Sequence, residues 1–291
     1  MKYRYLRFPG GLPKAVTFSY DDGCRWDKDL APIFNQYGVK GTFNINSSCV
    51  GASDWYLNKE EIKEYIVDGG HEIAVHGDKH IAPGVVRPID GIKEYLNCRL
   101  KLEEMFGGII RGMAYPNSGI KRMENGANYE NIREYMKNLD IVYGRSLGGE
   151  NDAFELPTDW LNWVPTMHHD HAYSLQWAQK FVELKCEEGY HTNRQPRLFY
   201  VWGHSYEFNQ RNNWEHMHDL LKILANREDT WYATNIEIYE YVEAYNHLVF
   251  SADSTVIHNP TATKIWFMQD GGIYSINPGE TIKIDAKEST T

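Results

Sequence analysis

Short apolar runs alternate with amphipathic segments along most of this chain of 291 residues. The runs have the length and composition of buried strands, and the segments between them carry apolar residues at helical spacing. A chain that repeats strand and helix in this way forms a mostly parallel sheet, because parallel neighbours need a crossover connection. This alternation limits the possible folds more than any other feature of the sequence.

The sequence predicts strands at Ala15–Tyr20, Gly41–Asn46, His71–Val75, Gly112–Tyr115, Ile141–Tyr143, Arg197–Trp202 and Trp231–Thr234. It predicts helices at Asp27–Tyr37, Tyr129–Asn138, Leu175–Glu188, Trp214–Asn226 and Ile236–Tyr245, a capping box of Asn58 and Glu61, and a helix capped by Asp90 that runs to about Phe106. Seven or eight such units in one domain favour a closed or nearly closed β/α barrel. An open doubly wound sheet is the alternative, although no glycine-rich phosphate loop follows any of these strands.

The pattern changes after about residue 247. Short strand-like runs are separated there by turn signals such as Asn259-Pro260 and Asn277-Pro278-Gly279. We therefore predict a barrel over residues 1–247 and a small antiparallel β appendage of three or four strands over residues 248–291. An appendage of this size would need to pack on the barrel to be stable.

Charge and cysteine content exclude several classes of partner. The formal net charge is -10 and no run of Lys and Arg stands out, so neither nucleic acid nor an anionic membrane is an expected partner. The four cysteines are scattered without a CxxC pair, which is typical of free thiols. No stretch is long and apolar enough for a signal peptide or a membrane span. The sequence as it stands indicates a cytoplasmic protein, or a secreted one if a signal was cut away.

Polar residues follow three of the predicted strands at the points where the strands end. Asp21 and Asp22 follow the first strand, His76 and His80 follow the third, and His204 follows the sixth. In β/α barrels the reacting groups lie at the carboxyl ends of the strands. We therefore expect these five side chains to meet at one rim.

His76 and His80 are four residues apart, a spacing that would place both imidazoles on one face of a helical turn. With the carboxylate of Asp22 they form a set of ligands that suits zinc, and also cobalt, nickel or manganese, and leaves positions open for water and substrate. The sequence predicts a divalent metal site here, with zinc preferred.

Four motifs, TFSYDDG, GHEIAVHGDKH, MAYPNSG and FYVWGH, occur in this order along the chain. They resemble the motifs of the polysaccharide deacetylase family (NodB homology, carbohydrate esterase family 4) over roughly residues 12–245. The resemblance implies a distorted β/α barrel and a metal-dependent hydrolase that removes N- or O-linked acetyl groups from a polysaccharide or oligosaccharide. It also implies Asp21 as general base, Asp22, His76 and His80 as metal ligands, and His204 as general acid.

The resemblance is weaker around the rest of the site. It implies that the backbone N–H of Tyr115 stabilises the oxyanion and that Asp159 and Trp160 form the element whose Asp orients the acidic His. Where the family carries an Arg that pairs with the base, this chain has Ala114, and Arg111 would lie at the other end of the strand.

The run from His168 to His171, which includes His169, could touch substrate at the same rim. Its composition favours a solvated polar loop, and a second metal site is the least favoured interpretation.

Two other functions remain open at this point. The same fold could hydrolyse a small cyclic amide, as some relatives of the family do. A carbohydrate-binding protein on a decayed enzyme scaffold is the other alternative, prompted by Ala114 and by the β appendage. Retention of the base, the acid and all three metal ligands favours an enzyme acting on an acetylated saccharide.

Overall fold

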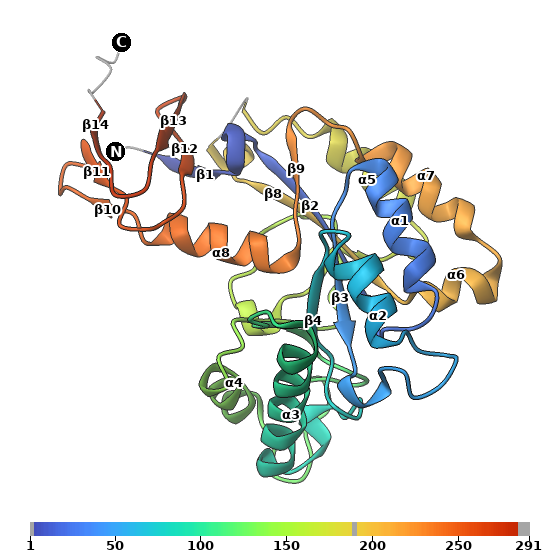
Figure 1. The fold of residues 1–291 in the computed structure, drawn as a ribbon. Coiled ribbons are helices and arrows are strands. Elements are labelled where there is room, and N and C mark those ends of the chain that lie inside the picture. The colour runs from blue at the N-terminus through green and yellow to red at the C-terminus, as the bar shows by residue number, and fades with distance from the viewer. Residues whose placement is uncertain (1–2, 188–190, 285–291) are drawn as a thin grey trace.

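A computed structural model describes residues 3–187 and 191–284 (Figure 1). Its centre is a parallel sheet of eight strands in the order β6-β5-β4-β3-β2-β8-β7, with β9 also paired to β2. The strands are β2 (Lys14–Asp21), β3 (Gly41–Ile45), β4 (Glu72–Val75), β5 (Gly112–Ala114), β6 (Tyr143–Arg145), β7 (Met167–His168), β8 (Arg197–Gly203) and β9 (Thr230–Tyr232). The sheet curls into a half-barrel whose two edges are β6 and β7, so the predicted distorted β/α barrel is confirmed.

Helices cover the outside of the curled sheet. They are α1 (Asp27–Tyr37), α2 (Lys59–Glu61), α3 (Pro88–Phe106), α4 (Tyr129–Asn138), α5 (Ser174–Glu183), α6 (Ser205–Arg211), α7 (Trp214–Leu224) and α8 (Asn235–Asn246). In Figure 1, α1, α5, α6 and α7 gather on one side of the sheet, while α3 and α4 lie on another. The main core lies between these helices and the strands, where rings such as Phe18 and Phe34 pack 4.8 Å apart.

Local signals placed several elements correctly and others with a shift. Helix α1 ends as predicted, at Gly38 in the left-handed conformation (φ 68°), and Asn58 and Glu61 form the predicted capping box. Asp90 is not a cap, because Pro88 already occupies the first turn of α3, where its missing N–H costs nothing. Strand β6 begins and ends two residues later than predicted, and neither β7 nor α6 was predicted.

The C-terminal strands form two small antiparallel sheets, so the predicted antiparallel appendage is confirmed, but its described residues form five C-terminal strands where three or four were predicted. One sheet contains β10 (Val249–Phe250), β11 (Val256–His258) and β14 (Thr281–Lys283), and the other contains β1 (Arg4–Arg7), β12 (Ile265–Gln269) and β13 (Gly272–Ile276). Strand β1 therefore pairs with β12, a strand far along the chain, next to α8 (Figure 1). Tyr241 of α8 joins both strands, since its hydroxyl donates to the carbonyl oxygen of Arg7 and accepts the N–H of Trp266. A domain boundary at residue 247 stays a prediction.

Among the described residues, no helix combines the length and the apolar character that a membrane span requires.

Candidate metal centre and active site

The chain turns sharply where β2 ends, and this turn presents two neighbouring carboxylates. Asp21 is the last residue of the strand and only 3% exposed. Asp22 and Gly23 both have positive φ, of 79° and 63°. A non-glycine residue in this region costs about 1 kcal/mol or more, and such strain clusters at functional sites. The turn lets Asp21 point into the curled sheet while Asp22 lies at its rim.

His76 and His80 reach Asp22 from the loop after β4. This loop is not helical, so the prediction of a helical turn was wrong: Gly77 (φ 85°) and His80 (φ 62°) are left-handed and bend the chain back on itself. The bend nevertheless brings both imidazoles to one carboxylate. The distances to Asp22 Oδ1 are 3.5 Å from His76 Nε2 and 3.2 Å from His80 Nε2.

These three residues fit a divalent cation. His76 Nδ1 lies 2.9 Å from the carbonyl oxygen of Ala114, so its N–H is directed there and the Nε2 lone pair faces Asp22. Burial lowers the pKa of His76, which favours the neutral ring that a metal needs. Burial alone would raise the pKa of Asp22, but His80 and His76 lower it to about 2. One ligand atom from each of the three residues lies within 4.8 Å of the others, close enough to share one ion.

His204, directly after β8, faces the same carboxylates. Its Nε2 is 3.9 Å from Asp21 Oδ2 and 3.9 Å from Asp22 Oδ2. On the other side of the ring, Nδ1 is 3.6 Å from Glu207 Oε2, and Glu207 also accepts the backbone N–H of His204 at the start of α6. Burial lowers the pKa of His204, but Glu207 and the two aspartates outweigh burial and raise it. The five side chains expected at one rim do come together.

Arg145 is a partner of Asp21 that sequence reasoning missed. Its side chain is fully buried and forms an ion pair with Asp21 Oδ2, while Asn44 donates to Asp21 Oδ1 at 2.8 Å. Burial raises the pKa of Asp21, but Arg145, His76 and His204 together lower it. The two-residue error in β6 hid this contact, because a strand ending at Tyr143 left Arg145 in a loop. In the structure β6 ends at Arg145, which pairs with Ala114 of β5.

The remaining predicted site residues lie away from this centre or form hydrogen bonds with residues outside it. Asp159 accepts the hydroxyl of Tyr129 at 2.6 Å and caps a short helical turn, and Trp160 donates to Glu243 at 3.2 Å. In the described part of the chain, neither has a hydrogen bond, ion pair or ring contact with His204. Glu207 is the carboxylate next to His204, three residues further along α6.

Tyr115 and His169 are both buried. Tyr115 donates its N–H to the carbonyl oxygen of Arg145 at 3.0 Å and its hydroxyl to that of Leu161 at 2.9 Å. Both donors are therefore used within the protein, which leaves no observed support for Tyr115 as the oxyanion donor. His169 is enclosed by the rings of Tyr20 and Phe208, so it is placed to support the site rather than to touch substrate.

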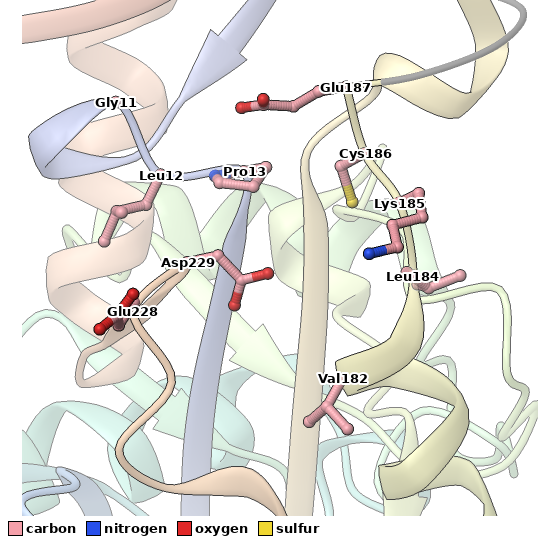
Figure 2. A pocket seen from close by; sticks show the side chains of 10 residues that line it. All are labelled: Gly11, Leu12, Pro13, Val182, Leu184, Lys185, Cys186, Glu187, Glu228 and Asp229. Carbon is pink, nitrogen blue, oxygen red and sulfur yellow. The ribbon is translucent and has the colours of Figure 1, made fainter.

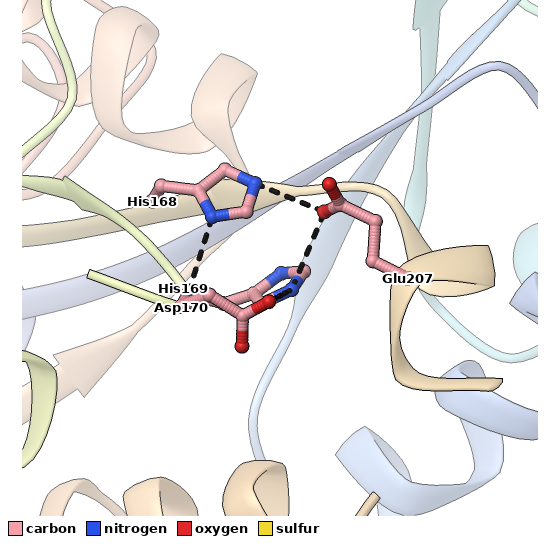
Figure 3. A group of neighbouring side chains, drawn as sticks. All are labelled: His168, His169, Asp170 and Glu207. Carbon is pink, nitrogen blue, oxygen red and sulfur yellow. Dashed lines mark hydrogen bonds and ion pairs between the residues drawn. The ribbon is translucent and has the colours of Figure 1, made fainter. Parts of the chain in front are cut away.

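A second group of possible ligands consists of His168, His169, Asp170 and Glu207 (Figure 3). Glu207 Oε2 lies 2.9 Å from His168 Nε2 and 3.4 Å from His169 Nε2. His168 Nδ1 accepts the N–H of Asp170, which places its ring proton on Nε2. His80 Nδ1 lies 3.2 Å from the amide nitrogen of Asn117, so the proton position does not distinguish the two groups. The ion pairs of their carboxylates do. Arg211 already forms ion pairs with Asp170 and Glu207. This group therefore fits a charged hydrogen-bond network beside His204 better than a second metal site.

A pocket of about 400 Å³ lies at the opposite end of the sheet (Figure 2). Its wall includes Pro13 and Asp229, which precede β2 and β9, and Val182 and Leu184 at the end of α5. None of the residues that line it belongs to the centre around Asp22. The pocket is therefore separate from that centre.

Comparison with known proteins agrees with the first three of the four motifs. Residues 3–143 match the family model for polysaccharide deacetylase. The resemblance to the polysaccharide deacetylase family is confirmed. No curated protein sequence matches the chain.

Solved structures show the same fold at low sequence identity. A putative polysaccharide deacetylase from Mycobacterium smegmatis is 15% identical, with 83% of this chain and 94% of that chain covered and a TM-score of 0.56. Puue allantoinase is 12% identical, with coverage of 80% and 91% and a TM-score of 0.58. The chain spans only 55% of the Streptococcus pyogenes deacetylase PplD, at 18% identity, with 46% of this chain covered and a TM-score of 0.39. The first two likenesses show that this chain shares its fold with a putative deacetylase and with an allantoinase.

Proposed function

We propose that this chain is a metal-dependent deacetylase that hydrolyses the acetyl group of an acetylated saccharide. One observation carries the proposal. Asp22, His76 and His80 converge at the carboxyl end of the sheet, and a buried carboxylate and a third imidazole, Asp21 and His204, flank them. A cation site, a base and an acid in this arrangement suit the metal-assisted hydrolysis of an acyl group.

Asp22, His76 and His80 would hold the cation, and their nitrogen and oxygen ligands suit zinc, with cobalt, nickel or manganese as alternatives. When bound, such a cation polarises a carbonyl group and acidifies the attacking water. His76 is the most buried of the three ligands, and the carbonyl oxygen of Ala114 holds its ring on the side away from Asp22. His80 is about one third exposed, so the cation would face the solvent and the substrate on its side.

Asp21 is placed to act as the general base. Arg145 and Asn44 hold its two oxygens, and its lowered pKa keeps it ionised at neutral pH. Asp21 Oδ2 is 3.9 Å from His76 Nε2, so the carboxylate lies beside the ligand group. A water molecule attacking a carbonyl carbon there would pass its proton to Asp21.

His204 is placed to protonate the leaving amine or alkoxide. Its Nε2 faces the two aspartates, while Glu207 lies on the Nδ1 side and also binds the backbone N–H. Glu207 and the two aspartates favour the doubly protonated ring, which carries on Nε2 the proton that the leaving group would accept. We therefore expect Glu207 to orient His204, the role that the family resemblance implied for Asp159.

Hydrolysis of a small cyclic amide is the second candidate, motivated by the shared fold of the allantoinase. Both reactions use attack of water on a carbonyl carbon, so the centre alone does not separate them. The test incubates the zinc-loaded protein with N-acetylchitooligosaccharides, acetylated xylooligosaccharides and a cyclic ureide. Acetate release with no turnover of the ureide supports the first candidate, and ureide opening without acetate release contradicts it.

A decayed carbohydrate-binding protein is distinguished by the same assay. It would bind the oligosaccharides without releasing acetate from any of them. Asp21→Asn provides the internal control, since it removes the base while leaving the size and shape of the side chain almost unchanged. Acetate release that this substitution abolishes belongs to this centre and not to a contaminant.

A further inference from the structure

Arg145 holds Asp21 from the far edge of the sheet, and the strand next to the arginine has a small residue at the position beside it. We propose that Arg145 is the positioning residue for the carboxylate of Asp21, and that position 114 is kept as alanine to give the arginine room. The proposal rests on the proposed function and adds to it the residue that orients the base.

The contact crosses the inside of the curled sheet. Arg145 ends β6 at one edge, and β5, β4 and β3 separate β6 from β2 in the order of the strands. The guanidinium nevertheless reaches Asp21 Oδ2 at the end of β2. A pair this far apart in the sheet and in sequence can meet only because the sheet is curled, so the ion pair fixes the carboxylate against the opposite wall.

The arginine itself is held in place. Its guanidinium carbon lies 4.6 Å from the ring centroid of Trp202, in β8, and the side chain is fully buried. Its Nε and Nη1 have no hydrogen-bond acceptor in the described part of the chain. A buried donor without a partner destabilises the fold, because the hydrogen bond that it made to water in the unfolded chain is not replaced. The unpaired donors reduce the stability that the ion pair contributes. A positioning role explains why the guanidinium is nevertheless held beside a reactive carboxylate.

Ala114 is the direct neighbour of Arg145 in the parallel pairing of β5 with β6. Side chains at paired positions lie on the same face, about 5 Å apart, so a large residue at 114 would occupy the space beside the arginine. Ala114 keeps only a backbone role, accepting from His76 Nδ1. The space between these positions and Asp21 therefore holds one guanidinium, from position 114 or from position 145, but not two.

This geometry predicts that Ala114→Arg lowers kcat when Arg145 is present and raises kcat when Arg145 is replaced by alanine. Arg145→Ala should lower kcat about 100-fold with little change in KM or zinc affinity, because the base loses its orientation. Ala114→Arg alone should also lower kcat, because it crowds Arg145. The double variant, Ala114→Arg with Arg145→Ala, should return to within about tenfold of wild type, because it delivers the guanidinium from the adjacent strand.

The experiment measures kcat and KM for all four proteins on the acetylated oligosaccharide that the wild type hydrolyses fastest. Arg99→Ala serves as the matched control, since Arg99 is a partly buried arginine on α3 that pairs with Glu103, away from the centre. Unchanged kcat in Arg145→Ala, or a double variant no better than Arg145→Ala, overturns the proposal. If Arg145→Ala does not fold, the double variant decides: a folded, active protein supports the proposal and an unfolded or inactive one contradicts it.

The two proposals can fail separately. A wild type that releases no acetate from any glycan contradicts the proposed function. The role of Arg145 is then judged by urea unfolding in the presence and absence of the Asp21 carboxylate. Arg145→Ala should destabilise the wild type clearly more than it destabilises Asp21→Asn, and an equal loss in both backgrounds overturns the pairing.

Discussion

Two acidic side chains at opposite ends of the central sheet have very different surroundings. Asp21 ends β2 and is paired with the guanidinium of Arg145. Glu72 begins β4 and accepts hydrogen bonds from three neutral donors, the hydroxyls of Tyr143 (2.6 Å) and Thr42 (2.8 Å) and the N–H of Ile236 (2.9 Å). Asp21 is buried and Glu72 is half-buried, and among the described residues only Asp21 has a formal cation beside it.

The difference appears in the charge each group carries. Burial raises the pKa of both groups, and for Asp21 the arginine and two histidines more than reverse the effect. For Glu72 the three neutral donors only reduce it, and the pKa is raised to about 7. Neutral hydrogen bonds therefore do not offset desolvation here, whereas a cation does. The carboxyl end of the sheet therefore carries an ionised carboxylate, whereas at the amino end Glu72 ties β4 to the first turn of α8 through Ile236.

Asp21→Asn should have the largest effect on this comparison. Loss of the base should reduce acetate release about 10³- to 10⁴-fold, while zinc binding through Asp22, His76 and His80 persists. The equivalent change at the other end, Glu72→Gln, should leave kcat within about twofold. Similar losses of kcat in both variants would show that the two ends are not functionally distinct.

Loss of a proposed metal ligand should come next. His76→Ala removes the ligand that Ala114 holds in position, so zinc affinity should fall at least about 100-fold and activity should require excess zinc. His168→Asn, in the second group of polar residues, is the control and should bind zinc as the wild type does. A drop in zinc stoichiometry in His168→Asn would instead indicate that the second group also binds the metal.

A smaller effect is expected from Glu207→Gln. The amide still fills the space but no longer supports a positively charged His204, so kcat should fall about tenfold with KM nearly unchanged. Asp159→Asn tests the alternative that the family resemblance suggested and should have no effect on kcat. The reverse result, with Asp159 needed and Glu207 dispensable, would remove Glu207 from the mechanism.

The smallest effect concerns stability at the amino end. Glu72 binds its proton more tightly in the folded protein (pKa about 7) than its ordinary value of 4.5. Its contribution is therefore fully present below about pH 4.5 and is lost as the pH rises through 7. Between these limits, urea unfolding should show the wild type losing about 3 kcal/mol more stability than Glu72→Gln. Parallel pH profiles for the two proteins would mean that Glu72 is ionised in the fold.

Much of the centre could be predicted because its residues are adjacent in sequence or follow strands. Asp21, Asp22, His76, His80 and His204 each lie within a few residues of a strand end, and parallel strands bring their carboxyl ends together. The local conformation was not predictable in the same way. The four-residue spacing of His76 and His80 suggested a helical turn, but Gly77 allows a left-handed bend that achieves the same convergence.

The supporting residues were missed for two different reasons. Arg145 depends on the end of a three-residue strand and on the curl of the sheet, and neither is encoded in local spacing. Glu207 lies on α6, a helix of seven residues that has too few turns to show a clear apolar period. The family resemblance directed attention to Ala114 and Asp159, where the chain keeps neither the arginine nor the contact with His204. Partner residues can move between elements while the reacting residues stay in place.

The central claim is that one cation, held by Asp22, His76 and His80, is needed for deacetylation. The most direct test is to remove metal with a chelator and then titrate zinc into the protein while following acetate release from an acetylated oligosaccharide. We predict no acetate release without metal, a linear rise on addition of zinc, and saturation at one equivalent per chain. Acetate release that persists in the metal-free protein would contradict the claim.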